Sequence, residues 1–80
     1  MRAKIYVTPR KGVLDPQGKA IEGSLHSLGF KEAAGVLMGK FLIVEIKGIT
    51  PSEAKIRVKE MCEKLLTNPI IEDFTFQIEE

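Results

Sequence analysis

The sequence has few of the residues that give small proteins extra stability or reactive chemistry. It contains one cysteine, one histidine and no tryptophan, and 6% of its residues are aromatic. A lone cysteine excludes an internal disulfide, and no set of cysteines and histidines is present to hold a structural metal. The core of an 80-residue chain has to offset roughly 1.5 kcal/mol of conformational entropy per residue. Self-association is therefore the expected additional source of stability.

Net charge and long apolar runs are also nearly absent. Twelve basic and 11 acidic residues leave a net charge of +1, which argues against a dedicated binder of nucleic acids or membrane surfaces. The chain has no apolar run of roughly 18 residues, and its N-terminus alternates charged and apolar residues instead of showing a signal-peptide pattern. A soluble, reducing, cytoplasmic setting is expected. Residues 1–20 are mainly basic and residues 61–80 mainly acidic, which is typical of ends that lie side by side.

Two segments in the first half of the chain have clear periodicity. Apolar and polar residues alternate over 3–8, which predicts a half-buried strand. Asp15 is placed to cap a helix that begins at Pro16, and the apolar stripe that follows ends at Gly29. Two apolar runs, 36–38 and 41–46, flank Gly39 and Lys40, and this spacing predicts a β-hairpin.

The second half of the chain predicts a helix and a final strand. Thr50 and Glu53 match a capping box, and the helix that they begin ends near Asn68 and Pro69. Alternation over 70–78 predicts the last strand. The order is βαββαβ, so we expect one α+β domain over residues 1–80 with the ferredoxin-like architecture, in which two helices cover one face of a four-stranded antiparallel sheet.

This architecture places the basic first strand beside the acidic last strand, with Lys4 and Asp73 as a candidate ion pair. It leaves the other face of the sheet uncovered within a monomer. Apolar residues on such a face indicate a partner. The candidates for self-association are Tyr6, Phe41 and Ile43, with Ile71 on the same face.

The usual catalytic and metal-binding patterns are not found. Cys62 falls on the apolar stripe of the second helix, which indicates a packed thiol, and His26 lies off the stripe of the first helix, which indicates a solvated side chain. Glu72 and Asp73 are neighbours on a strand and point to opposite faces. Binding of RNA is not favoured, because residues 40–45 lack the paired aromatics that would complement Tyr6. We therefore expect no catalytic, cofactor-binding or metal-binding residues in this chain.

Two stretches are candidates for contact with other proteins. The first combines cations, a helix cap and exposed apolar residues, and admits three interpretations: a turn that begins the helix, a contact surface for a partner, or an anion site at the helix N-terminus. The second ends one helix and begins a strand. Their residues are Arg10, Lys11, Gly12, Val13, Leu14, Asp15, Pro16 and Gln17 in the first stretch, and Asn68, Ile71 and Glu72 in the second.

Four segments together resemble a known family. Gly12-Val13-Leu14-Asp15-Pro16-Gln17-Gly18, Leu28-Gly29-Phe30, Gly39-Lys40 and Leu65-Leu66-Thr67-Asn68-Pro69-Ile70-Ile71-Glu72 are similar to the PurS family, the small subunit of phosphoribosylformylglycinamidine synthase. The resemblance extends over nearly the whole chain.

The resemblance implies a noncatalytic subunit in the fourth step of purine biosynthesis. It implies a homodimer or a dimer of dimers that brings a glutaminase subunit and a large synthetase subunit together and assists ammonia transfer between them. ATP and Mg²⁺ would be used by the synthetase subunit and not by this chain. The two stretches defined above would then be the contacts with the larger subunits.

Other small βαββαβ proteins leave an alternative open. They include ligand-binding regulatory modules and acyl-phosphate hydrolases. A hydrolase needs an arginine that grips the anion and an amide that orients water, and Arg10 with Asn68 would serve only if the fold brought them together.

Overall fold

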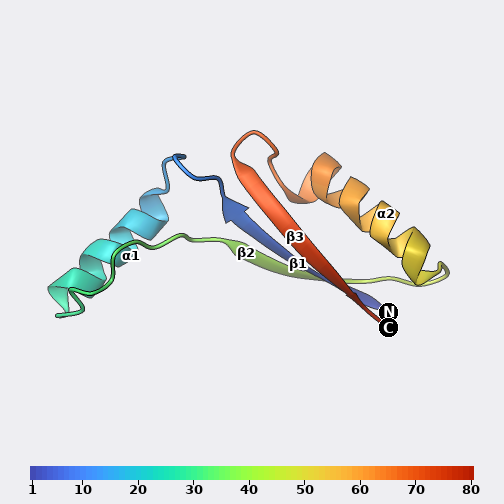
Figure 1. Ribbon diagram of the computed structural model, residues 1–80, viewed down its shortest axis with the longest axis horizontal. Helices are drawn as coiled ribbons and strands as arrows, with labels where there is room; N and C mark the ends of the chain where they lie inside the picture. Colours follow the sequence, from blue (N-terminus) through green and yellow to red (C-terminus); the bar gives the residue numbers. More distant parts are fainter.

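The chain forms three strands and two main helices in a computed structural model that describes all residues, 1–80 (Figure 1). The strands make one antiparallel sheet in the order β2-β1-β3, so the predicted α+β class is confirmed. No helix is long and apolar enough to span a membrane. In chain order the elements are β1 (Arg2–Pro9), α1 (Pro16–Ser27), β2 (Lys40–Glu45), α2 (Pro51–Met61), the π-helical turn η1 (Cys62–Leu66) and β3 (Glu72–Glu79).

Both helices begin where the sequence predicts. The Asp15 carboxylate accepts a hydrogen bond from the Gly18 amide, and Pro16 is the first residue of α1. Thr50 and Glu53 form the capping box at α2, each side chain accepting from the other's backbone N–H at 3.2 Å. Such caps satisfy backbone donors that have no partner within the helix, so they fix the helix start locally.

The core lies between β1 and α2. Ala3, Ile5 and Val7 alternate on the helix side of β1 and are fully buried, and they pack with Ala54 and Val58 of α2. Cys62 completes this cluster with no exposed surface, which confirms the predicted packed thiol. Half-buried residues of both outer strands surround it: Leu42, Val44, Phe74, Phe76 and Ile78.

The predicted four-stranded sheet is not present, because the predicted hairpin does not form. Residues 36–38 pair with no strand, and the chain runs straight through Gly39 into β2 (Figure 1). A two-residue hairpin turn needs positive φ angles, and Gly39 is not among the residues that have one. Instead, Gly39 lies so close to β1 that a Cβ atom there would collide with the carbonyl oxygen of Val7.

Because the hairpin is open, α1 lies away from its own sheet. We call residues 16–39, which comprise α1 and the extended segment that returns to β2, the arm. The arm projects to one side of the sheet while α2 covers the sheet near β3 (Figure 1). The molecule is 50 Å long, and the radius of gyration of its Cα atoms is 16.0 Å. Ferredoxin-like proteins cover one face with two helices, whereas only α2 covers this sheet.

The pairing of the basic first strand with the acidic last strand is confirmed, but the predicted ion pair is wrong. Lys4 lies opposite Gln77 in the register, and its Nζ is 3.0 Å from a carboxylate oxygen of Glu79. Asp73 lies opposite Thr8, at the other end of β1. The sequence indicated which strands pair but not their register, and the register decides which charges meet.

Candidate functional site

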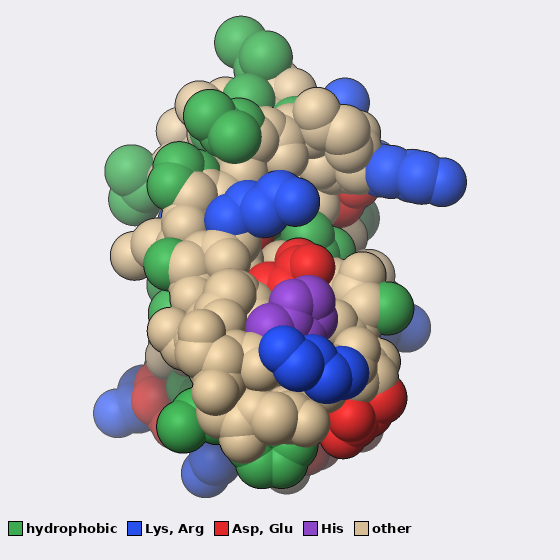
Figure 2. All heavy atoms as spheres, turned by 90° about the vertical axis from the view of Figure 1, so that its left-hand side faces the viewer, with side chains coloured by type: hydrophobic (Ala, Val, Ile, Leu, Met, Phe, Trp, Pro, Cys, Tyr) green, Lys and Arg blue, Asp and Glu red, His purple; other side chains and the backbone are tan.

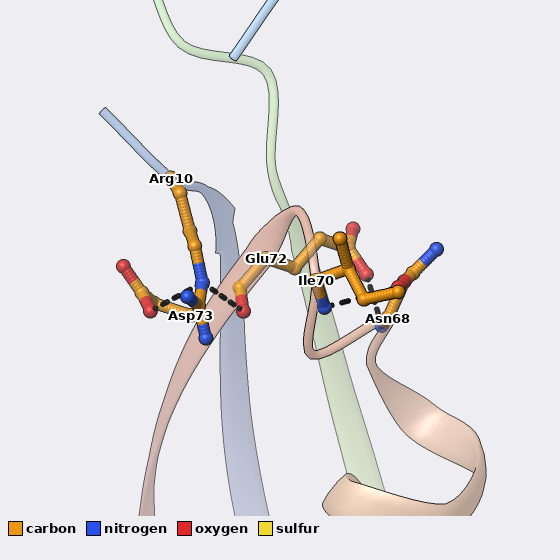
Figure 3. Close-up of polar contacts among 5 residues, drawn as sticks. All are labelled: Arg10, Asn68, Ile70, Glu72 and Asp73. Carbon is orange, nitrogen blue, oxygen red and sulfur yellow. Dashed lines mark hydrogen bonds and ion pairs between the residues drawn. The ribbon is translucent and has the colours of Figure 1, made fainter. Parts of the chain in front are cut away.

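The end of β1 and the start of β3 form a polar corner at one end of the sheet (Figure 3). The Arg10 amide donates to the Ile71 carbonyl at 2.8 Å, and Arg10 Nε lies 3.3 Å from both the Glu72 carbonyl oxygen and Asp73 Oδ1. On the other side of the turn, Asn68 N donates to Glu72 Oε1 at 2.8 Å and Asn68 Oδ1 accepts from the Ile70 amide. The structure therefore joins Arg10 of the first predicted stretch to Ile71 and Glu72 of the second, and Asn68 reaches the same corner through Glu72.

Apolar side chains project from this corner into solvent. Leu65 and Ile70 are 82% and 80% exposed, and Ile71 is also exposed. The backbone around Ile70 and Ile71 is held by the hydrogen bonds of the corner, so these side chains stand on an ordered turn. We call Leu65, Asn68, Ile70, Ile71 and Glu72 the corner surface. An ordered turn with exposed apolar side chains is suited to protein contact, because little conformational entropy remains to be lost on binding.

The remainder of the first predicted stretch leads away from the corner. The Val13 amide donates to the Arg10 carbonyl at 3.1 Å, and Gly12 has a φ of +86°, so the chain turns at residues 10–13. Leu14 is largely exposed just before α1. No side-chain interaction joins Lys11 or Gln17 to the corner. The structure thus divides this stretch between a turn beside the corner and the start of the arm.

Asp15 connects the two halves of the arm. Its Oδ1 accepts from the Gly18 amide at 3.0 Å and its Oδ2 accepts from the Met38 amide at 2.9 Å. These two N–H groups, that of Met38 first, hold the pKa of the Asp15 carboxyl below its usual value of 3.8. The Asp15 carboxylate therefore takes up the Gly18 donor at the start of α1 and ties it to the end of the arm.

The sheet face away from α2 carries the predicted self-association residues. Tyr6 and Phe41 lie directly opposite each other on β1 and β2, with ring centroids 5.0 Å apart. Ile43, two residues further along β2, is exposed on the same face. The structure thus places these three side chains together on one exposed face of the sheet.

The other reactive side chains have structural positions. Burial raises the pKa of the Cys62 thiol, and the nearby negative charge of Glu63 adds to the effect. His26 is half-buried, and its Nε2 lies 2.6 Å from the Ala33 carbonyl oxygen, so the prediction of a solvated histidine is wrong. The structure shows no cavity and no group of three or more His, Cys, Asp or Glu side chains around a common point.

The fold brings Arg10 and Asn68 to one corner, which the hydrolase alternative requires, but in an unsuitable arrangement. The Arg10 guanidinium faces the Asp73 carboxylate, the Asn68 backbone N–H donates to the Glu72 carboxylate, and the Asn68 side-chain oxygen accepts from the Ile70 amide (Figure 3). Two carboxylates at this point oppose an anionic phosphate. The geometry does not favour acyl-phosphate chemistry here.

Three residues that make contacts in these sites were not predicted as site residues from the sequence. Asp73 pairs with Arg10, Lys40 Nζ lies 3.6 Å from Glu72 Oε2, and Met38 supplies the second donor to Asp15. Each contact joins residues more than 20 positions apart. Opposite charge at the two ends of the chain was the only signal in the sequence, and it did not specify partners.

Comparison with known proteins identifies relatives along the whole chain. The family model PurS, described as phosphoribosylformylglycinamidine (FGAM) synthase, matches residues 2–80. The Bacillus subtilis phosphoribosylformylglycinamidine synthase subunit PurS is 42% identical over 79 residues, which cover 99% of this chain and 93% of that protein. The corresponding Methanocaldococcus jannaschii subunit is 36% identical over 78 residues, covering 98% and 94%.

Solved structures agree with this assignment. A crystal structure of Bacillus subtilis PurS superposes with a TM-score of 0.88 at 42% identity and covers 99% of this chain and 98% of its own. A chain in the structure of PurLQS from Thermotoga maritima superposes with a TM-score of 0.85 at 30% identity, covering 95% and 93%. The chain belongs to the PurS family of phosphoribosylformylglycinamidine synthase subunits.

Proposed function

We propose that this chain is the noncatalytic assembly subunit of phosphoribosylformylglycinamidine synthase in de novo purine biosynthesis. It brings the glutaminase and the large synthetase subunits together and assists the transfer of ammonia between them. The observation that carries this proposal is the likeness, over 95% of the chain, to a chain in the structure of Thermotoga maritima PurLQS. The relatives named as PurS subunits support the same conclusion.

In this proposal the chemistry takes place in the partner subunits. ATP and Mg²⁺ are used by the synthetase subunit, and glutamine is hydrolysed by the glutaminase subunit. Residues 1–80 act as one domain of a cytoplasmic complex. The buried, packed Cys62 and the Arg10 side chain, which is held by Asp73, are consistent with a chain that contributes structure to the complex.

The contacts with the larger subunits are assigned to residues 10–17 and to the corner surface. The hydrogen bonds of Arg10 hold the start of this stretch beside Ile71 and Glu72, so Arg10 and the corner surface can face one partner at the same end of the sheet. The exposed Leu65, Ile70 and Ile71 supply apolar area, and Glu72 and Asp73 supply a polar rim. Interfaces commonly combine an apolar centre with such a rim.

The chain also associates with itself in this proposal, as a dimer or a dimer of dimers. The four-stranded ferredoxin-like sheet is reached only in that assembled state, because a single chain supplies three strands and leaves its arm uncovered. The exposed Tyr6, Phe41 and Ile43 are assigned to a second contact between copies.

Reconstitution with purified synthetase and glutaminase subunits tests the function. We expect glutamine-dependent product formation only when this chain is present, and a ternary complex by light scattering. Ammonia-dependent product formation by the synthetase subunit serves as the internal control, because it does not need transfer from the glutaminase. Full glutamine-dependent activity without this chain would contradict the proposal.

A further inference from the structure

Exposed apolar side chains lie on the arm, on the outer face of the sheet and on the corner surface. Figure 2 views the molecule from the side where the arm projects and shows hydrophobic side chains at the surface there. The first two groups belong to the self-association proposed above. The corner surface, in contrast, belongs to a turn, and two polar side chains of that turn accept hydrogen bonds from its backbone N–H groups.

Glu72 closes the turn through a reciprocal pair of hydrogen bonds with Asn68 (Figure 3). The Glu72 N–H donates to the Asn68 carbonyl oxygen at 2.8 Å, and Glu72 Oε1 accepts from the Asn68 N–H, also at 2.8 Å. Within this ring, Asn68 Oδ1 accepts from the Ile70 N–H at 3.2 Å, and the Asn68 carbonyl oxygen also accepts from the Ile71 N–H at 3.1 Å. Pro69 has no N–H, so every backbone donor of residues 68–72 has an acceptor within the turn.

The second oxygen of the Glu72 carboxylate is also paired within the chain. Glu72 Oε2 lies 3.6 Å from Nζ of Lys40, the first residue of β2, and the Glu72 side chain is 19% exposed. The neighbouring Asp73 carboxylate pairs with Arg10 at 3.3 Å. Both carboxylates are therefore neutralised by cations of the same chain. A cation of another protein would gain little beside them, whereas the exposed apolar side chains of the corner have no such partner.

We infer that Asn68 and Glu72 are positioning residues, whose side chains fix the turn so that Ile70 and Ile71 dock on an apolar surface of a larger subunit. This inference rests on the proposed function and deepens it. The apolar side chains make the contact, and the two polar side chains act through the backbone of the turn. The Glu72 carboxylate belongs to the polar rim by its place, but its hydrogen bond and its ion pair are made within this chain.

A turn that is fixed before binding favours association. Ordering a backbone on binding costs conformational entropy, and a preformed turn avoids that cost. Ile70 is 80% exposed, so its own packing within the chain contributes little to holding the turn. Without the Glu72 acceptor, the Asn68 N–H loses its partner and one side of the reciprocal pair is open. The affinity for the larger subunit should then fall although no contacting side chain has changed.

Two substitutions of Glu72 separate positioning from direct contact. Glu72→Gln keeps an oxygen that accepts from the Asn68 N–H but removes the charge, whereas Glu72→Leu removes both. We expect Glu72→Gln to bind the larger subunits within about twofold of wild type and Glu72→Leu to bind about tenfold more weakly, by titration calorimetry. A carboxylate that contacted a cation of the partner would lose as much affinity in Glu72→Gln as in Glu72→Leu, and that result would overturn the inference.

Asn68 offers a second pair of substitutions, and Glu79 offers a matched control. Asn68→Asp keeps the oxygen that accepts from the Ile70 N–H, and Asn68→Ala removes it, so Asn68→Ala should bind more weakly than Asn68→Asp. Glu79→Leu makes the same change as Glu72→Leu at the other end of β3, where the carboxylate pairs with Lys4 and with no backbone amide. Equal losses of affinity in Glu79→Leu and Glu72→Leu would overturn the inference.

Amide hydrogen exchange on the free chain measures the turn without a partner. The Asn68 N–H should be protected in wild type and in Glu72→Gln, and it should exchange at least about tenfold faster in Glu72→Leu. The amide of the buried Ile5 should keep its protection in all three chains, which separates a change in the turn from loss of the fold. Equal protection of the Asn68 N–H in Glu72→Leu and wild type would overturn the inference.

Failure of the inference and failure of the proposed function give different results. If the wild-type chain neither binds the larger subunits nor supports glutamine-dependent turnover, the proposed function is rejected and the inference falls with it. If the wild-type chain does both and Glu72→Leu binds equally well, the inference alone is rejected.

Discussion

The Asp15 carboxylate accepts a hydrogen bond of 2.9 Å from the amide of Met38, 23 residues further along the chain. The same carboxylate caps α1 through the Gly18 amide. One side chain therefore fixes both the start of the arm and the end of its return segment, beside the point where β2 begins. The direction of the arm depends on this carboxylate.

Asp15→Asn should destabilise the protein in a pH-dependent way. The pKa of Asp15 is lowered in the folded state, so its contribution to stability is present above the unfolded pKa of about 3.9 and is lost as the pH falls through the lowered folded value. An asparagine still caps α1, but its NH₂ group cannot accept from Met38. We expect a lower Tm than wild type at pH 7 and a difference that narrows below about pH 4.

Thermal unfolding between pH 3 and pH 7 measures this difference. Glu32→Gln is the control, because Glu32 is exposed and lies in the turn at the far end of the arm. A constant difference between Asp15→Asn and wild type over the whole range would contradict the assigned role of the charge.

Lengthening the chain at Gly39 should allow residues 36–38 and β2 to form the hairpin that the sequence predicted. Two residues, Asn-Gly, inserted after Gly39 supply the positive φ angles that a tight turn needs. We expect a monomer with a radius of gyration near 12 Å, in place of a larger assembly, measured by light scattering and small-angle X-ray scattering. The same insertion after Glu32 should leave the assembly unchanged, and an equal effect of both insertions would argue against a specific role of Gly39.

The core between β1 and α2 should be sensitive to a single truncation. Ile5 is fully buried, so Ile5→Ala should lower the free energy of unfolding by about 2–5 kcal/mol. Ile56→Ala removes the same atoms from an exposed position on α2 and should change the free energy of unfolding by less than about 0.5 kcal/mol. Urea unfolding compares the two variants. Similar losses of stability in both would contradict the position of the core between β1 and α2.

The capping box should contribute measurably to α2. Thr50 accepts from the Glu53 amide, so Thr50→Ala should cost about 1 kcal/mol. Ser52→Ala is the control, because Ser52 is exposed and is the second residue of α2, between the two residues of the capping box. Urea unfolding measures the free energy of unfolding of both variants. If the m-value is unchanged, the loss of stability in Thr50→Ala arises in the folded helix. No loss of stability in Thr50→Ala would contradict the capping geometry.

The corner surface should matter for assembly and not for folding. Ile71→Asp changes an exposed side chain and leaves the backbone hydrogen bonds with Arg10 and Asn68 in place. We expect binding to the larger subunits to weaken about tenfold, equivalent to 1.4 kcal/mol, with a matching loss of glutamine-dependent turnover at limiting concentration.

Ile56→Asp is the control for that experiment, because Ile56 is exposed on α2, outside the corner surface. Titration calorimetry measures the binding. Equal affinity of Ile71→Asp and wild type for the larger subunits would show that the corner surface is not part of the interface.

Local features of the sequence determined much of the fold. Alternation over 3–8 specified β1, and the residues at 15–16 and 50–53 specified both helix starts, because a cap satisfies backbone donors within three residues of itself. The apolar stripe placed Cys62 in the core. The resemblance of four short segments to the PurS family was also visible in the sequence, and the family model that matches residues 2–80 confirms it.

Only the tertiary structure decided whether Gly39 turns and which charges meet. A glycine followed by a lysine is compatible with either a hairpin or an extended strand, and here contact with the Val7 carbonyl and the hydrogen bond from Met38 to Asp15 select the extended form. Arg10 meets Asp73, and Lys4 meets Glu79, only because β1 and β3 pair in one register. Sequence periodicity specifies the face on which a residue lies, whereas the strand register and the backbone conformation at Gly39 are set by contacts between distant segments.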